Sequence, residues 1–401
     1  MSDRLTSPPR TARFATFLIF CLNGFGLGMW LVHLPNVEHN IGVPHSVLGL
    51  LLLVLGGAAL IGMQVVGPLV DRIGPRRLTP AAAAAFGLSL TVPGWLTSWW
   101  SLGLILIVMG FANGALDVSM NAHAVVVERG YDRPIMAAFH AMWSIGGAFA
   151  ALIGAVVLNA NVPTGLTMTI TGLFVAALSL VALRFTIDAD HHGRTEETVD
   201  TEAKPAPPKS LVWILGGLAL ALMLAEGVAN DWAALELKGI LNASASEAAL
   251  GYGAFAVAMT IGRFATDRVA AAIGATRVVR YGAAIAAIGL TVASVSPWIP
   301  LALVGWALFG IGLAGGVPQL FTAAGNLDHR SAGALMARVV GLGYVGLLAG
   351  PAVIGGLTRL MPLNVAFALP IILCVLTVVF ASALNPREEK ELVGQRPMRN
   401  V

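Results

Sequence analysis

The sequence predicts an all-α membrane protein with twelve transmembrane helices in two pseudo-symmetric six-helix bundles. Apolar residues make up 57% of the 401 residues, and charged residues only 11%, less than half the share of about 25% that is typical of soluble domains. Uncharged apolar runs of about 20 residues recur along the chain, each long enough to cross ~30 Å of hydrocarbon as a helix. The 46 glycines would weaken soluble helices but allow close helix contact in a bilayer.

The apolar runs set the approximate positions of the spans. They fall at 13–36, 46–69, 78–96, 100–127, 134–159, 163–184, 210–237, 246–266, 276–295, 299–322, 332–357 and 363–385.

The basic residues predict the orientation. With both termini and every second loop on one side, that side holds all of the 24 Lys and Arg residues except Lys238 and Arg359. Basic residues concentrate on the cytoplasmic side of membrane proteins. We therefore expect both termini in the cytoplasm, an even number of spans, and a place in the inner (plasma) membrane.

One long polar stretch divides the chain. Residues 185–209 are rich in acidic residues and proline and cannot bury a core. They predict a cytoplasmic linker between an N-terminal bundle (1–184) and a C-terminal bundle (210–385), with 386–401 as a cytoplasmic tail. A histidine pair in the linker is interpreted as solvated rather than metal-binding, and we expect no metal and no cofactor.

The two halves resemble diverged repeats at an offset near 200 residues. Gly110 corresponds to Gly310, and Gly146 to Gly346. An Asp-Arg pair follows a glycine in the corresponding loop of each half, as Asp71-Arg72 and Asp267-Arg268. Paired six-helix repeats around a central site are a common transporter plan.

Asp117 is the sharpest functional candidate, because ionisable residues inside spans are costly and mark functional sites. It lies twelve residues before Arg129, about 18 Å into the membrane at ~1.5 Å per residue. Gly110, Asn113, Gly114, Asp117 and Asn121 share one face of that helix. A polar stripe of this kind faces a cavity or another helix.

The seventh span carries a second polar cluster. Glu226 lies about 24 Å from Ser210 at ~1.5 Å per residue, with Asn230 one turn further on the same face. Asp231 points about 140° away from Glu226, and Trp232 follows it. Glu226 and Asp231 are candidates for proton coupling and Asn230 and Trp232 for substrate binding, although Asp231 also suits an outer gate.

Two further helices offer polar and aromatic side chains that suit a small polar ligand. On the first span Asn23, Trp30 and His33 lie toward one face, although Trp30 and His33 also suit an outer membrane interface. On the fifth span His140 and Trp143 share a face, and His140 also suits an inner gate.

One loop carries a recognisable motif. The segment GPLVDRIGPRR, between the second and third spans, resembles the best-known loop motif of the major facilitator superfamily. The matching positions are Gly67, Leu69, Asp71, Arg72, Gly74, Arg76 and Arg77.

Four further segments narrow the resemblance to the fucose:proton symporter-like branch, near rhizopine-associated membrane proteins. These segments are LDVSMNAHAVVVERG, FHAMWSIGG, EGVANDWAALEL and GRFATDR. The resemblance extends over all twelve spans and implies a rocker-switch transporter. Asp71 would then cap the eleventh span near Ser331, and Arg72 and Arg76 would join a gate-stabilising charge cluster. Pro75 departs from the pattern, since a basic residue is usual there.

In the same resemblance an acid followed four positions later by asparagine occupies this place, which Asp117 and Asn121 match. The resemblance implies that Asp117 takes part in proton coupling, and Asn121 is a candidate for substrate binding. Family members also carry an acid on the first span, but this chain has no charge from Phe14 to Val37. Either Glu226 or Asp231 replaces that acid, or the coupling differs.

The function that these patterns predict is transport of a small polar, sugar- or cyclitol-like solute with protons, by a monomer in the lipid bilayer and without nucleic acid. Efflux of a metabolite or drug by proton exchange stays open as an alternative. A membrane-embedded sensor or enzyme has less support, because the chain lacks a GxxxxGK[ST] phosphate loop, an HExxH zinc motif and a GxSxG elbow.

Overall fold

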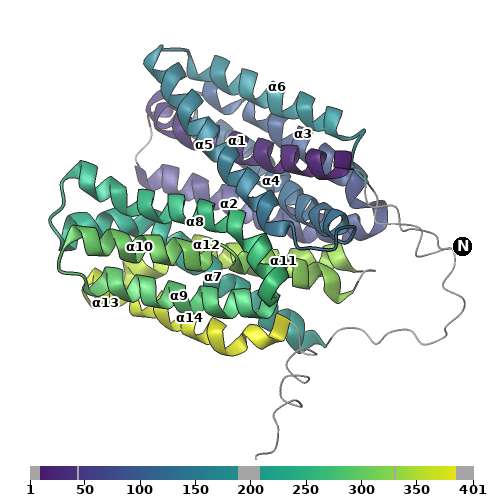
Figure 1. Ribbon diagram of the computed structural model, residues 1–401. Helices are drawn as coiled ribbons and strands as arrows, with labels where there is room; N and C mark the ends of the chain where they lie inside the picture. Colours follow the sequence, from purple (N-terminus) through teal and green to yellow (C-terminus); the bar gives the residue numbers. More distant parts are fainter. Residues whose placement is uncertain (1–9, 43–44, 188–207, 329–330, 385–401) are drawn as a thin grey trace, which may run out of the picture. The chain divides into compact units, whose positions relative to one another are not determined.

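The computed structural model describes residues 10–42, 45–187, 208–328 and 331–384, and every regular element in them is a helix (Figure 1). The elements of the first half are α1 (Arg10–Ile41), α2 (His45–Ile73), α3 (Pro75–Leu90), η1 (Pro93–Trp95), α4 (Trp99–Glu128), α5 (Met136–Asn159) and α6 (Thr164–Ala182). Those of the second half are α7 (Lys209–Ile240), α8 (Ala245–Ile273), α9 (Ala275–Val295), α10 (Ile299–Leu313), α11 (Gly316–Leu327), α12 (Ala332–Leu357), α13 (Leu363–Ala366), α14 (Ala368–Phe380) and η3 (Ala381–Leu384).

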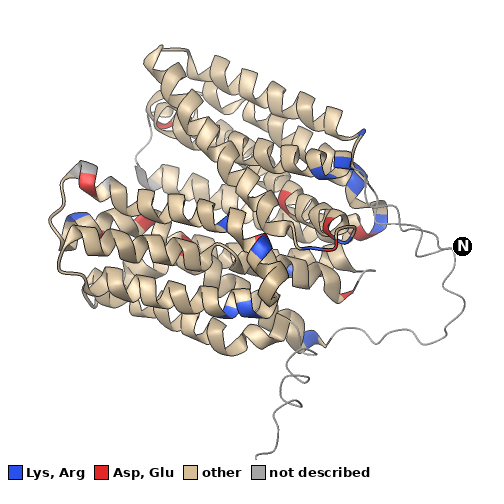
Figure 2. Ribbon diagram, viewed as in Figure 1, with Lys and Arg blue, Asp and Glu red and all other residues tan. Residues whose placement is uncertain are grey.

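The membrane-spanning character that the sequence predicts is present throughout. Within the described chain, ten segments are long and apolar enough to cross a membrane. The 16-residue α3 and the 29-residue α8 account for the other two predicted spans. Figure 2 shows long stretches of most helices without a charged residue, with Lys and Arg mainly toward helix ends.

Two predicted spans each contain a local break in the helix close to a proline, although each is still one membrane-spanning segment, Ile299–Leu327 and Leu363–Leu384. The span predicted at 299–322 divides into α10 and α11, and the span predicted at 363–385 divides into α13 and α14. Pro318 and Pro370 follow the breaks by a few residues and cannot donate the hydrogen bond to the carbonyl four residues earlier. In the first case Gly315 and Gly316 weaken the helix at the same place.

The described residues fall into two compact units. One unit contains residues from 1–206 together with 325–341, and the other contains residues from 207–324 and 342–401. The sequence-based halves differ from these units at 325–341, which groups with the first unit. Most of the predicted linker (185–209) and the whole predicted tail (386–401) lie outside the described residues.

Close helix pairs hold the first unit together. α2 packs along α4, and α1 packs along α5. Gly110 on α4 meets the Leu55 carbonyl of α2, and Gly146 on α5 meets the Cys21 carbonyl of α1, so that neither position has room for a Cβ atom. Small residues permit this close approach where no hydrophobic effect drives helices together.

The second unit repeats these contacts at the corresponding residues. Gly310 on α10 meets the Phe255 carbonyl of α8, and Gly346 on α12 meets the Leu220 carbonyl of α7. The glycine pairs that suggested a sequence repeat therefore have the same packing role in each unit.

Candidate functional site

The polar face of α4 is buried along its whole length. Asn113, Asp117 and Asn121 are each at most 6% exposed. Gly114, between them, lies against the Ala59 carbonyl of α2 with no room for a Cβ atom. The small residues of the predicted stripe thus bring α4 against α2, while Asn113 contacts α1.

Asn23 and Asn113 join three helices of the first unit through hydrogen bonds. The Asn23 Nδ2 donates to Asn113 Oδ1 at 2.9 Å, and the Trp143 Nε1 donates to Asn23 Oδ1 at 2.8 Å. Asn23 lies on α1, Asn113 on α4 and Trp143 on α5. We call these three side chains the amide cluster. It brings together two predicted binding residues, Asn23 and Trp143, and adds Asn113.

Asp117 lies one turn along α4 from the amide cluster. The Asn121 Nδ2 donates to the Asp117 backbone carbonyl at 2.9 Å. The Asn121 Oδ1 is buried and has no hydrogen-bond partner among the described residues. This face therefore carries a buried carboxyl group and an acceptor that a small polar molecule could use.

The other predicted residue pair of α1 is fully enclosed. Trp30 is 2% exposed and His33 is 0% exposed. The His33 Nδ1 lies 3.0 Å from the Met29 carbonyl oxygen of its own helix. Both side chains therefore pack between helices in this structure, and their predicted binding role stays a prediction.

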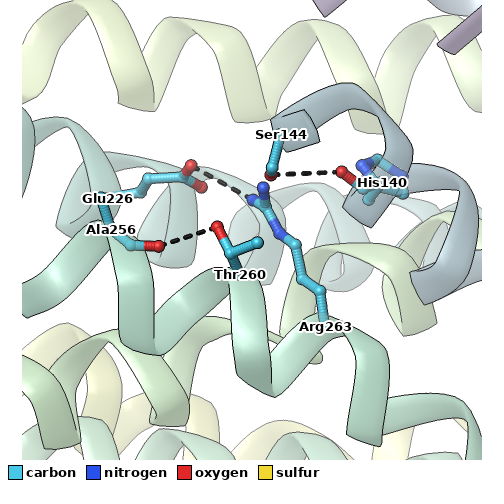
Figure 3. Close-up of polar contacts among 6 residues, drawn as sticks. All are labelled: His140, Ser144, Glu226, Ala256, Thr260 and Arg263. Carbon is cyan, nitrogen blue, oxygen red and sulfur yellow. Dashed lines mark hydrogen bonds and ion pairs between the residues drawn. The ribbon is translucent and has the colours of Figure 1, made fainter. Parts of the chain in front are cut away.

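His140 lies on α5 one turn before Ser144, whose Oγ donates to the His140 carbonyl oxygen at 3.3 Å (Figure 3). The imidazole stands edge-on to the Phe20 ring of α1, with 5.4 Å between ring centroids. This ring contact places His140 on the side of α5 that packs against α1.

His123 has a well-defined neutral form. The Ile187 backbone N–H donates to His123 Nε2 at 3.2 Å, so Nε2 carries no proton. The Thr16 hydroxyl donates to the Ala12 carbonyl oxygen, so its oxygen accepts from His123 Nδ1 at 3.1 Å. With both ring nitrogens engaged and no exposed surface, His123 holds α1 and α4 to the start of the predicted linker.

Glu226 forms an ion pair inside the second unit. The Arg263 Nη2 of α8 lies 3.4 Å from the Glu226 Oε1 of α7, and the side chains are only 9% and 19% exposed, respectively (Figure 3). Tyr252, also on α8, interacts electrostatically with both members and with Asp231. A charge pair at this depth is costly unless each partner compensates the other.

The remaining predicted residues of α7 lie in different surroundings. Asn230 and Asp231 are exposed, whereas Trp232 is half-buried beside Gly355 of α12. The Trp232 Nε1 is buried without a hydrogen-bond partner among the described residues. Glu226 pairs with Arg263 whereas Asp231 is exposed, and their predicted difference in direction stays a prediction.

The predicted gating loop places Asp71 at the start of α12. The Asp71 Oδ1 accepts from the Gly333 N–H at 2.6 Å, and its Oδ2 accepts from the Ala334 N–H at 2.9 Å. These are among the first N–H groups of a helix, which lack partners within it, and a carboxylate there also interacts favourably with the helix dipole. The predicted cap is therefore present, and its gating role stays a prediction.

Glycine shapes the ends of this loop and of its counterpart. Gly74 has φ 90° just before α3, and Gly274 has φ 85° just before α9, values that residues with a Cβ atom rarely adopt. Gly67 lies against Gly333 and Ala337 with no room for a Cβ atom. Arg72, Arg76 and Arg268 are exposed, and Asp267 is half-buried.

A second polar contact joins the end of α4 to the segment 325–341 within the first unit. The Arg129 Nη2 donates to the Gly325 carbonyl oxygen at 2.5 Å, and its Nε donates to Asn326 Oδ1 at 2.7 Å. Burial lowers the pKa of Arg129, and the Glu128 carboxylate opposes that shift. An arginine stays charged under such conditions, so the last carbonyls of α11 receive a cation.

Comparison with known sequences decides the family. The sequence profile described as the Major Facilitator Superfamily matches residues 16–229 and 214–400. This chain belongs to the Major Facilitator Superfamily. The motif-based prediction is thus confirmed, and the protein is a multi-pass membrane transporter rather than an enzyme.

Individual relatives are consistent with this assignment. An uncharacterised MFS-type transporter of Yersinia pestis is 32% identical over 385 residues, which cover 96% of this chain and 97% of the relative. The membrane protein MosC of Rhizobium meliloti is 27% identical over 347 residues, covering 86% and 83%, respectively. The solved structure of the superfamily member FucP in an outward conformation has a TM-score of 0.78 at 14% identity, covering 93% of this chain and 98% of FucP; this likeness concerns the fold.

Sequence reasoning missed two buried polar contacts in this transporter. It counted Arg263 among the cytoplasmic basic residues, but Arg263 of α8 is only 7% exposed and pairs with Glu226 of α7. It also omitted Glu236, which is fully buried on α7 and accepts a hydrogen bond from Trp306 Nε1 at 3.3 Å. The sequence held a signal for each residue. Arg263 lies ten residues before the end of its helix, and Glu236 is an acid within the apolar segment EGVANDWAALEL.

Proposed function

We propose that this transporter moves a small polar solute, such as a sugar or cyclitol, across the inner membrane by alternating access and proton symport. The amide cluster carries the proposal. Amide and indole groups are the hydrogen-bonding and stacking partners that neutral polar solutes use. Here they converge from α1, α4 and α5, and the Asn121 Oδ1, which has no partner in the described chain, lies further along α4.

Two buried acids support the coupling to protons. Asp117 follows the amide cluster by one turn of α4, so a solute bound there would lie near a group able to gain or lose a proton. Glu226 pairs with Arg263 in the second unit, and such a pair can be rearranged when a carboxylate is protonated. FucP is described as a fucose:proton symporter, which supports the same solute class at the level of the fold.

The proposal is tested with the full chain in liposomes under an imposed pH gradient. We expect at least one labelled sugar, cyclitol or amino acid in a panel to accumulate when the gradient is inward, and a protonophore to abolish the accumulation. Liposomes without protein and liposomes with no gradient are the controls. If a solute moves only in the direction opposite to the proton flow, the protein is an efflux transporter instead. If the gradient drives the flux of no solute, both the symport and the efflux proposals are wrong.

We also propose that both termini face the cytoplasm. The support is the placement of the basic residues, all but a few of which lie on one side of the predicted spans. Asp132, between α4 and α5, would then lie inside the cell, and Asn161, between α5 and α6, would lie outside.

Cysteine labelling checks this orientation. In a Cys21→Ala, Cys374→Ala background, we expect Asn161→Cys to react with an impermeant maleimide in intact cells. Asp132→Cys should react only after the membrane is made permeable. The reverse pattern would place the termini outside.

A further inference from the structure

A cavity of about 380 Å³ lies at one end of the first unit, apart from the amide cluster. It is bordered by the last turns of α1, by η1 and by the turn between α5 and α6. In the proposed orientation these are the three outward loops of the N-terminal half. Its volume falls within the range of about 300–1,000 Å³ that small-molecule pockets occupy.

The lining of this cavity is polar but uncharged. Asn36, Asn40 and Asn161 contribute amide groups, and no Asp, Glu, Lys or Arg is among the described residues that border it. The Asn36 Nδ2 donates to Thr164 Oγ1 at 3.2 Å, which orients its amide and leaves the oxygen as an acceptor. Each primary amide both donates and accepts hydrogen bonds, as a hydroxyl group does. The chemistry therefore suits a neutral ligand with several hydroxyl groups.

Trp95 supplies a fixed aromatic surface at the same cavity. Its Nε1 donates to Thr169 Oγ1 at 2.9 Å, and Gly165 lies so close to the ring that a Cβ atom would overlap it. The side chain is nevertheless 60% exposed. An indole held in place with much of its surface open can stack against the apolar face of a sugar-like ring.

The backbone at Asn161 adds a useful property. Its φ is 54°, the left-handed region that asparagine tolerates and glycine adopts without strain. Replacing Asn161 with glycine therefore deletes the amide without straining the turn that forms one wall of the cavity.

We infer that this cavity is a binding site for a neutral polyhydroxylated molecule, with Trp95 as the stacking surface and Asn36, Asn40 and Asn161 as hydrogen-bonding groups. The inference shares its solute class with the proposed function. Binding here is measured without flux, however, so that either idea can fail while the other stands. A site at the outward loops would meet a solute before it reaches the amide cluster.

The test is calorimetric titration of the purified full chain in lipid nanodiscs with myo-inositol, L-fucose and D-glucose, using choline and succinate as charged comparisons. We expect a neutral polyol to bind and the charged compounds not to bind. Loss of one amide hydrogen bond in Asn161→Gly or Asn40→Ala should weaken binding by about two- to tenfold. Asn159→Ala removes an exposed amide that does not border the cavity, and it should bind as the wild type does.

Tryptophan fluorescence locates the ligand. Trp95→Phe keeps an aromatic ring but removes one emitter, so the ligand-induced change in emission should shrink or disappear. Asp132→Asn, which changes an exposed acid that has no assigned role, should leave this signal intact. The inference is overturned if no polyol binds, if Asn161→Gly and Trp95→Phe behave like the wild type, or if Asp117→Asn alone removes binding. It is also overturned if the Trp95 variant changes only thermal stability, as an aromatic residue anchored at the lipid interface would.

Discussion

Replacing Asp117 with asparagine is expected to abolish uphill, pH-gradient-driven uptake while leaving solute exchange intact. Asparagine has nearly the same shape and can fill the same buried position on α4, where Asp117 is 6% exposed. It cannot take up or release a proton. Gradient-driven flux should therefore fall by roughly 10²-fold or more, the size of the contribution that a positioned proton-transfer group makes. The measurement is accumulation of the identified solute in liposomes with an inward proton gradient.

Counterflow separates this coupling role from a role in solute binding. Liposomes loaded with unlabelled solute exchange it for labelled solute without net proton movement, and Asp117→Asn should retain this exchange. Asp132→Asn changes an exposed acid outside the helices and is the matched control for loss of negative charge. Should Asp117→Asn and Glu226→Gln both keep full gradient-driven flux, the assignment of proton coupling to these acids is wrong.

The fold was largely predictable because a bilayer imposes strong constraints on composition. Every span must satisfy its backbone hydrogen bonds internally, so apolar length alone locates helices such as α4 and α5. The breaks near Pro318 and Pro370 were not predicted, because hydropathy measures apolar length and is indifferent to where the backbone hydrogen bonding is interrupted.

The candidate site was predictable in part, and for a physical reason. A lone acid such as Asp117 stands out in an apolar span because it is costly there. Its neighbours were harder to identify, since the sequence does not show that Asn23 of α1 meets Asn113 of α4, or that Arg263 turns toward Glu226. A count of basic residues treats each one near a loop as a marker of orientation. For that reason Arg263 was not recognised as the buried partner of Glu226 on α7.

Adding one methyl group at Gly146 is expected to destabilise the protein, whereas adding it at the next residue should not. A Cβ atom at Gly146 would overlap the Cys21 carbonyl oxygen of α1 and crowd the Phe25 backbone nitrogen. Since both are backbone atoms, relief requires α1 and α5 to separate, at a cost of about 1–3 kcal/mol for overpacking. The shift would also stretch the bond from Trp143 to Asn23, so solute binding should weaken together with stability.

Gly147 is the matched control, because a Cβ atom there would lie 3.9 Å from the Gly24 carbonyl oxygen, an ordinary contact distance. Alanine favours a helix over glycine by up to about 1 kcal/mol, so Gly147→Ala should be neutral or stabilising in thermal unfolding of the purified protein. Gly346→Ala, which meets the Leu220 carbonyl in the second unit, should reproduce the loss seen at Gly146. Equal unfolding temperatures for the Gly146 and Gly147 variants would show that α1 and α5 do not approach this closely, and the amide cluster that depends on their approach would lose its support.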